Sequence, residues 1–247
     1  EIIDGTYQED IIPVEEPYAF FEACSPRKVG DTYYLIYSPQ RGSRLVYATS
    51  KSPTGPFEYR GVTIDNGVDY PGGNNHGSIC NINGQWYIFY HRMTNNTIMS
   101  RRACVERIEI LPDGTIPEVE MTSLGFDHSL SPYKITPAEL ACVLKGGCFI
   151  TEKNPMTRPI TAITSGCIIG YKYFDFGKDY SGTTMKFSAR IKGTGCRSKI
   201  RILLDSYENG EEVGVCDIGA DDGVYSTVVR NITGRHAVFF IVEDTYG

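Results

Sequence analysis

A repeat of 53 residues constrains the fold of this chain more than any other feature of its sequence. Residues 27–38 (RKVGDTYYLIYS) align with residues 80–91 (CNINGQWYIFYH). Each copy has a polar turn with a glycine, followed by a run of aromatic and aliphatic residues. The first copy ends in Tyr37 and Ser38, and the second ends in Tyr90 and His91. Carried upstream, the same offset places Ser25 on Ser78. Hairpins that recur at a period near 50 residues are typical of the blades of a β-propeller.

The number of repeats predicts an incomplete ring. A closed ring of five such blades needs about 250 residues or more at this period. The repeating pattern occupies only roughly the first 130 residues, so we expect about half of a ring. Residues 1–136 are therefore predicted to be the C-terminal part of a five-bladed propeller domain.

The pattern of hydrophobic residues changes after residues 122–137. These residues show no hydrophobic periodicity and include many that favour turns. We interpret them as a linker. Beyond it, the run TMKFSARI alternates, and further short runs rich in β-formers are separated by turn residues. This spacing predicts an antiparallel β-sandwich, of the jelly-roll kind, over residues 137–247. The fold class expected for the whole chain is all-β.

Composition excludes several classes of function. The net charge of −6 argues against a nucleic-acid partner, and no apolar run is long enough to cross a membrane. The eight cysteines form no CxxC pair, so free and mostly buried thiols are expected, with one disulfide in the second half left open. The chain begins with EIIDG and ends with EDTYG, which predicts a segment of a longer protein, so localisation stays open.

Glu22 is the first candidate for chemistry. It lies in YAFFEACSPRK among Tyr18, Phe20 and Phe21, just before the first predicted hairpin, and the repeat places it on Asn75. An aromatic surrounding raises the pKa of a carboxyl group because desolvation disfavours the anion. Such a group can serve as a general acid toward a departing glycosidic oxygen. The alternative is an exposed glutamate at the end of a strand.

The segment GGNNHGS, residues 72–78, is the second candidate. Its glycines allow close approach of a ligand, Asn75 offers a donor and an acceptor to sugar hydroxyls, and His76 could bind a metal or orient a carboxylate. A hydrogen-bonded turn would explain the same residues. Arg101, at the start of a later strand, could point to the same site, whereas His91 is expected to be structural.

In the second domain, residues 170–177 (GYKYFDFG) form an aromatic strand. Strict alternation would place Tyr171, Tyr173 and Asp175 on one face. Exposed tyrosines suit the stacking of sugar rings, whereas core packing is the competing explanation.

Taken together, these motifs resemble known families. FFEACSPRK with YYLIYS, followed by GGNNHGS with NGQWYIFYHR, resembles the later blades of glycoside hydrolase family 43, of the arabinofuranosidase and xylosidase type. The second half, from GGCFITE through CIIGYKYFDFG to GRHAVFFIVED, resembles carbohydrate-binding module family 6.

The resemblance implies a five-bladed propeller that hydrolyses glycosides with inversion, without an organic cofactor. By resemblance, Glu22 is the general acid, and His76 is similar to a histidine that helps to hold a metal, usually calcium, near the propeller axis. Asn75 and Arg101 would contact the sugar at the cleavage point. The base and an orienting aspartate would lie upstream of residue 1, so this segment alone is expected to be inactive.

For the second domain, the resemblance makes Tyr171 the first platform aromatic. A second aromatic residue is expected just before VYSTVV, but Asp222 and Gly223 stand there, and the only tryptophan is Trp86. For the whole chain, the resemblance implies arabinoxylan or xylan as the partner, cleaved by an α-L-arabinofuranosidase or β-xylosidase. The alternatives are a non-catalytic glycan-binding protein and a structural β protein.

Overall fold

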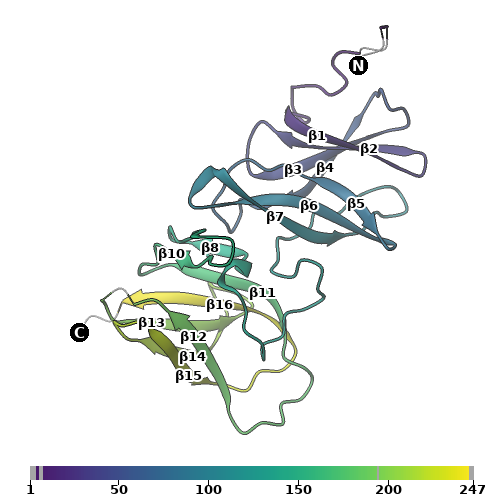
Figure 1. Ribbon diagram of the computed structural model, residues 1–247. Helices are drawn as coiled ribbons and strands as arrows, with labels where there is room; N and C mark the ends of the chain where they lie inside the picture. Colours follow the sequence, from purple (N-terminus) through teal and green to yellow (C-terminus); the bar gives the residue numbers. More distant parts are fainter. Residues whose placement is uncertain (1–3, 6–7, 194, 245–247) are drawn as a thin grey trace. The chain divides into compact units, whose positions relative to one another are not determined.

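A computed structural model of the protein describes residues 4–5, 8–193 and 195–244. Apart from one 3-10 turn, η1 (Ala138–Leu140), the regular elements of this part of the chain are strands, which confirms the all-β prediction (Figure 1). The chain divides into two compact units. The first consists of the described residues up to Val68 together with Gly72–Met93 and Ile98–Met121. The second consists of Thr122 onward together with Asp69–Pro71 and Thr94–Thr97.

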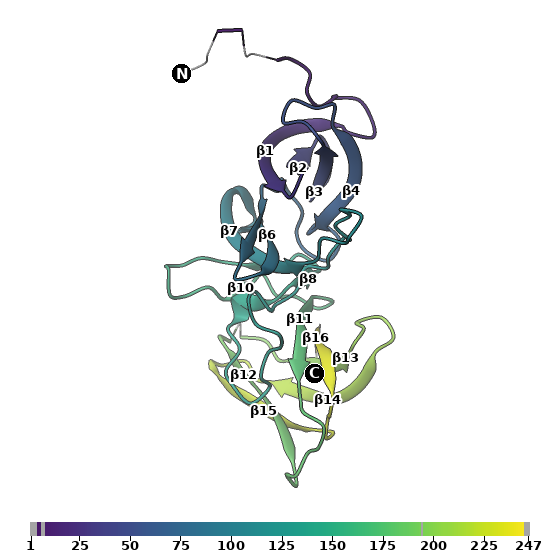
Figure 2. The same ribbon diagram turned by 90° about the vertical axis from the view of Figure 1, so that its right-hand side faces the viewer.

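The first unit contains two antiparallel meanders (Figures 1 and 2). One sheet has four strands in sequence order: β1 (Phe20–Val29), β2 (Thr32–Pro39), β3 (Arg44–Ser50) and β4 (Glu58–Asp65). The other has three: β5 (Ser78–Ile82), β6 (Gln85–Thr94) and β7 (Thr97–Ile108). A four-stranded meander is the usual content of a propeller blade.

The structure confirms the predicted repeat. The β1–β2 turn pairs Val29 with Thr32, and the β5–β6 turn pairs Ile82 with Gln85, which is the same pairing displaced by 53 residues. Among the described residues neither sheet closes on itself, so a ring of five blades stays a prediction.

The second unit has a five-stranded sheet in the order β14-β13-β16-β11-β8 and a two-stranded sheet of β12 and β15. Ring contact between Phe187 and Phe240, with centroids 5.0 Å apart, joins the two sheets face to face, as in a sandwich. A further pair, β9 with β10, is short. The strands are β8 (Val143–Lys145), β9 (Phe149–Ile150), β10 (Ile160–Thr161), β11 (Ile168–Asp175), β12 (Met185–Ile191), β13 (Ser198–Leu204), β14 (Glu211–Ile218), β15 (Gly223–Val229) and β16 (Arg235–Asp244).

The prediction that residues 122–137 form a linker is wrong. Ser123 N–H donates to Lys172 C=O at 2.8 Å, and Leu130 N–H donates to Tyr173 C=O at 2.8 Å. The segment therefore lies along β11 as part of the second unit. Its irregular sequence reflects a path held by hydrogen bonds to one strand, and this leaves no hydrophobic periodicity to read.

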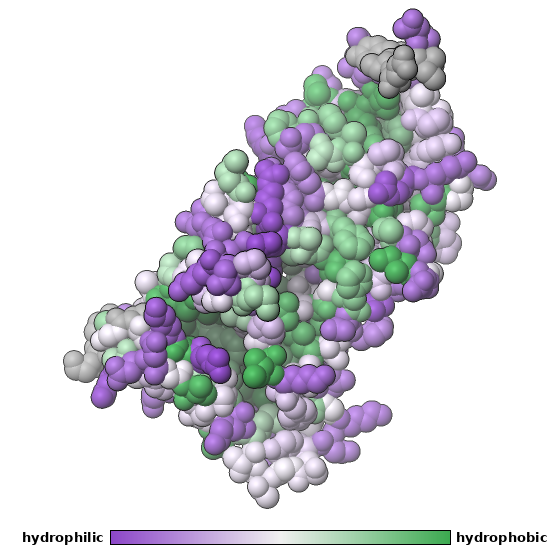
Figure 3. Space-filling model, in the orientation of Figure 1, coloured by the Kyte–Doolittle hydropathy of each residue, from purple (hydrophilic) through white to green (hydrophobic). Residues whose placement is uncertain are grey.

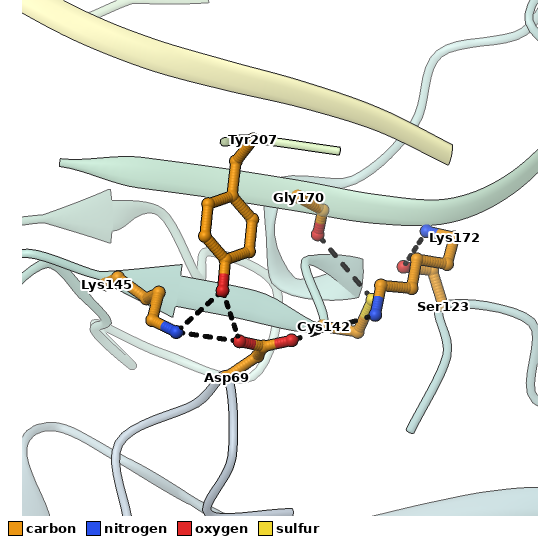
Figure 4. Close-up of polar contacts among 7 residues, drawn as sticks. All are labelled: Asp69, Ser123, Cys142, Lys145, Gly170, Lys172 and Tyr207. Carbon is orange, nitrogen blue, oxygen red and sulfur yellow. Dashed lines mark hydrogen bonds and ion pairs between the residues drawn. The ribbon is translucent and has the colours of Figure 1, made fainter. Parts of the chain in front are cut away.

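The carboxylate of Asp69 belongs to the second unit, although Asp69 precedes most of that unit in the sequence (Figure 4). Asp69 accepts hydrogen bonds from Lys145 Nζ at 2.8 Å and from the Tyr207 hydroxyl at 3.0 Å. Lys172 Nζ, on a side chain that is only 11% exposed, lies 3.9 Å from its other oxygen. Burial raises the pKa of Asp69, but Lys145, Tyr207 and Lys172 outweigh it and lower that pKa overall.

Hydrophilic side chains are spread over the face seen in Figure 3, with hydrophobic ones in small groups between them. The eight cysteines are free, as predicted, but only four of them, Cys142, Cys148, Cys167 and Cys216, are buried, so the expectation of mostly buried thiols is wrong. Among the described residues no helix has the length and apolar character that a membrane crossing requires.

Candidate active site

Glu22 lies within β1, and the prediction that it belongs to a loop before the hairpin is wrong. The pairing of β1 with β2 shifts register on both sides of Glu22, and the next residue, Ala23, has a φ of 58°. A bulge of this kind turns a side chain away from the regular alternation of a strand. Here it accompanies the contact that Glu22 makes with His76, in the loop that precedes β5.

His76 is the partner of Glu22. Glu22 Oε1 lies 2.9 Å from His76 Nε2, and the two side chains are 41% and 34% exposed. The hydrogen bond from His76 lowers the pKa of Glu22, against the smaller opposing effect of burial, and Asn74 and Arg101 lower it further. The expected rise in the pKa of Glu22 is therefore wrong in this structure.

The aromatic residues beside Glu22 explain the difference. The ring of Phe20 packs on Tyr37, with centroids 5.4 Å apart, and that of Tyr18 packs on Tyr59 at 6.0 Å. Phe21 is 60% exposed. These rings belong to the core of the first sheet or face solvent, so they do not enclose the carboxyl group.

The two adjacent asparagines of the GGNNHGS segment have different positions. Asn75 is buried: its Nδ2 donates to Ser43 C=O at 3.1 Å, and its Oδ1 accepts from His91 N–H at 3.2 Å. Both ends of its amide are therefore used inside the unit, which corrects the expectation that Asn75 contacts sugar. Asn74 instead lies close enough to Glu22 for its side chain to lower the pKa of that carboxyl group.

The backbone of this segment is tightly packed. Ser43 Oγ contacts both N and O of Gly73 at 2.5 Å. A Cβ atom added at Gly73 would lie 2.2 Å from Met93 Sδ, and one at Gly77 would lie 2.2 Å from Phe89 O. Gly77 leaves no room for a side chain because the atom that it faces is backbone, whereas at Gly73 the flexible side chain of Met93 would have to move.

Arg101 lies on the Glu22 side of β7. Its charge lowers the pKa of Glu22 and also, after burial, that of His91. Its side chain is exposed, and Nε donates to Ile98 C=O at 2.9 Å. The site thus brings together Glu22, His76, Asn74 and the field of Arg101, a set that can hold a hydroxylated ligand against a carboxyl group.

The match to known families falls on this part of the chain. Residues 2–116 match the model of the glycosyl hydrolases family 43. This part of the chain belongs to family 43. All the residues of the candidate site lie within the matched range.

Individual relatives extend over most of the chain. A xylosidase/arabinosidase of Thermoclostridium stercorarium is 51% identical over 93% of this chain and 56% of its own length. An arabinoxylan arabinofuranohydrolase of Bacillus subtilis (strain 168) is 29% identical over 94% of this chain and 50% of its own length. The chain thus spans about half the length of these relatives.

A solved structure has a similar fold. The crystal structure of a family 43 arabinoxylan arabinofuranohydrolase from Bacillus subtilis, in complex with cellotetraose, superposes with a TM-score of 0.50 and 29% identity. The match covers 92% of this chain and 52% of that chain.

Among the residues that the structure describes, no group of three or more His, Cys, Asp or Glu side chains could bind a metal. His76 uses Nε2 toward Glu22, so Nδ1 is the ring nitrogen that a metal could take. Calcium takes six to eight oxygen ligands. The residues present therefore do not make a calcium site by themselves.

The remaining predicted site residue, Tyr171, is not an exposed platform. It is 8% exposed, packs on Phe174 and Phe240, and its hydroxyl donates to Ala138 C=O at 3.2 Å. The predicted alternation fails because the pairing of β11 with β16 shifts register between Tyr171 and Phe174, so that both rings are buried.

The sequence did not predict that Asn74 lowers the pKa of Glu22, nor that His91 Nδ1 accepts a hydrogen bond from the backbone N–H of His76. The signal for Asn74 was its place beside Asn75, since only one of two adjacent asparagines in an extended segment can face the core. For His91 the signal was weaker, because its contact runs to a backbone N–H.

Proposed function

We propose that this chain is part of a glycoside hydrolase that cleaves arabinofuranosyl or xylosyl linkages in hemicellulose, with Glu22 as its general acid. The observation that carries the proposal is the position of Glu22, held by His76 and close to Asn74 within the range matched by family 43. The relatives named above, a xylosidase/arabinosidase and an arabinoxylan arabinofuranohydrolase, support the substrate class.

In the proposed reaction, Glu22 gives its proton to the glycosidic oxygen as the bond from that oxygen to the anomeric carbon breaks. A water attacks the opposite face of the sugar and loses its proton to a second carboxylate. The lowered pKa makes Glu22 an anion at neutral pH in this structure. A bound sugar would exclude water from Glu22 and favour its protonated form, because desolvation disfavours the anion.

The second carboxylate is proposed to come from sequence N-terminal to residue 1. Among the residues that the structure describes, the side chains that shift the pKa of Glu22 are those of His76, Asn74 and Arg101, none of which is a carboxylate. Inverting hydrolysis needs two carboxyl groups about 6.5–9.5 Å apart. Residues 1–247 are therefore proposed to be inactive alone.

A direct test compares residues 1–247 with the same residues in a longer chain that carries the preceding blades. Both are assayed on arabinoxylan, xylo-oligosaccharides and aryl glycosides, and the anomer released is identified by proton NMR. Turnover by the longer chain alone, with inverted configuration, supports the proposal. Equal turnover by residues 1–247, or none by either chain, contradicts it.

A calcium ion near the propeller axis is proposed as a further component, held in part by His76 and otherwise by oxygen ligands from water or preceding sequence. It would act by fixing the residues around it. Calorimetric titration of calcium into the longer chain should give binding that His76→Ala weakens. Unchanged binding in this variant would remove His76 from the site.

The second unit is proposed to be a glycan-binding module of family 6. Its support is the sequence resemblance and the two antiparallel sheets joined through Phe187 and Phe240. Because Tyr171 is buried, any sugar-binding surface must use other residues. Affinity electrophoresis of the 247-residue chain in xylan-containing gels tests the proposal, and unretarded migration would contradict it.

A further inference from the structure

One side chain behind the candidate acid has a contact that the proposed reaction does not use. His91 lies in β6, is 9% exposed, and its Nδ1 accepts the backbone N–H of His76 at 3.2 Å. His76 in turn contacts Glu22 through Nε2. We propose that His91 is a positioning residue for Glu22, acting through the backbone of His76. The inference rests on the proposed function of Glu22 as the acid.

Three contacts fix His91 itself. Its backbone N–H donates to Asn75 Oδ1 at 3.2 Å, and its C=O accepts from Asn66 Nδ2 at 2.6 Å. Its ring stands edge-on to that of His76, with centroids 5.4 Å apart and planes at 74°. Because its backbone and its ring are both held, its Nδ1 provides a fixed point for the His76 N–H.

The contact defines the tautomer of His91. A ring nitrogen that accepts a hydrogen bond carries no proton, so this contact puts the proton of the neutral ring on Nε2, a buried nitrogen with no hydrogen-bond partner among the described residues. A neutral histidine with its proton on Nε2 cannot ligate a metal through that nitrogen, which separates His91 from the role proposed for His76.

The alternative is that His91 only fills space in the core. The two roles differ because positioning depends on the acceptor at the Nδ1 position, whereas filling depends on volume. Asparagine places a side-chain oxygen near the position of Nδ1 in histidine. Leucine has a similar volume without an acceptor. His91→Asn should therefore preserve the position of His76, and His91→Leu should lose it.

The first measurement uses the unchanged 247-residue chain and needs no variant. Nitrogen-15 NMR should show a scalar coupling across the hydrogen bond between the amide nitrogen of His76 and Nδ1 of His91. It should also show His91 as the tautomer with its proton on Nε2. Absence of the coupling, or a proton on Nδ1, would overturn the proposal.

The second measurement compares the variants. In His91→Leu, the amide of His76 should exchange with solvent roughly tenfold faster, as expected for the loss of one hydrogen bond, and the nuclear Overhauser contact between His76 and Glu22 should weaken. His91→Asn should restore both. An unchanged contact in folded His91→Leu would overturn the proposal. Neither measurement uses turnover, so these outcomes are distinct from a failure of Glu22 as the acid.

Discussion

The Oγ atoms of Ser25 and Ser78 lie 2.9 Å apart and form a hydrogen bond, although the residues are equivalent positions of two successive repeats. Arg27 Nε also donates to Ile79 C=O at 3.1 Å. The first strands of the two meanders, β1 and β5, therefore contact each other at Ser25–Ser78 and at Arg27–Ile79. Equivalent positions meet in this way when the first strands of successive blades lie around a common axis, and the contact of Glu22 with His76 occurs in the same region.

The adjacent asparagines give a matched pair of variants. Asn75→Ala should lower the free energy of unfolding by roughly 1–3 kcal/mol, because it leaves the buried Ser43 C=O and His91 N–H without their partner. Asn74→Ala should change stability by less than about 0.5 kcal/mol. Urea denaturation of the 247-residue chain measures both values. Equal losses for the two variants would contradict their different positions.

The Asp69 cluster predicts a pH-dependent stability. The pKa of Asp69 is lowered in the folded chain, so its charge stabilises the fold above the unfolded value of about 3.9, and this contribution disappears as the pH falls through the folded value. Asp69→Asn should cost roughly 1–3 kcal/mol at neutral pH, between the values typical of exposed and buried pairs. The difference from the unchanged chain should shrink below about pH 4.

The control for this variant is Glu211→Gln, which removes an exposed partner of Arg230 and should have little effect. Denaturation of the three proteins at neutral and acidic pH makes the comparison. A constant difference between Asp69→Asn and the unchanged chain at every pH would show that the charge of Asp69 is not responsible.

The sequence predicted the repeat well because hairpins are local: glycine turns and alternating aromatic residues specify them within a dozen positions. The prediction from sequence failed where a one-residue irregularity in a strand decides which way a side chain points. The register shifts beside Glu22 and Tyr171 reverse the side on which a side chain lies, and no pattern of residue types marks them. The pKa of Glu22 depends on His76, which lies in the loop before β5, and periodicity does not describe a contact between a strand and a distant loop.

The same limit applies to the boundary of the second unit. Its members Asp69 and Asn95 lie far upstream of Thr122, and Asn95 N–H donates to Ile150 C=O at 2.7 Å. A composition change along the chain cannot reveal segments that join a unit from a distance. The sequence therefore placed its boundary near residue 136, and this boundary stays a prediction.

These upstream segments predict the behaviour of a truncated chain. A fragment of residues 138–247 lacks Asp69, Asn95 and the segment that lies along β11, so it should unfold at a lower temperature than the same unit in the full chain. A fragment of residues 122–247 should be intermediate, because it regains the hydrogen bonds of Ser123 and Leu130. Calorimetry of the three chains measures the order, and an equally stable shorter fragment would contradict it.

Tyr171 is predicted to act on stability. Tyr171→Ala should cost roughly 3–5 kcal/mol, the range seen when large buried aromatic residues are truncated. Tyr171→Phe keeps the ring and loses only the hydrogen bond to Ala138, so it should cost about 1 kcal/mol. Thermal denaturation gives both values. A stable Tyr171→Ala variant that no longer binds xylan would instead assign this ring to the sugar.

The role of Glu22 is tested most directly by Glu22→Gln in a longer chain with measurable turnover. Glutamine is nearly isosteric but has no proton to donate to the departing oxygen, so kcat on xylo-oligosaccharides or arabinoxylan should fall about 10²–10⁴-fold. On aryl glycosides, whose leaving groups need less protonation, the loss should be much smaller. The ratio of the two losses is the measurement. Equal losses on both kinds of substrate, or no loss on the natural one, would contradict the assignment of Glu22 as the general acid.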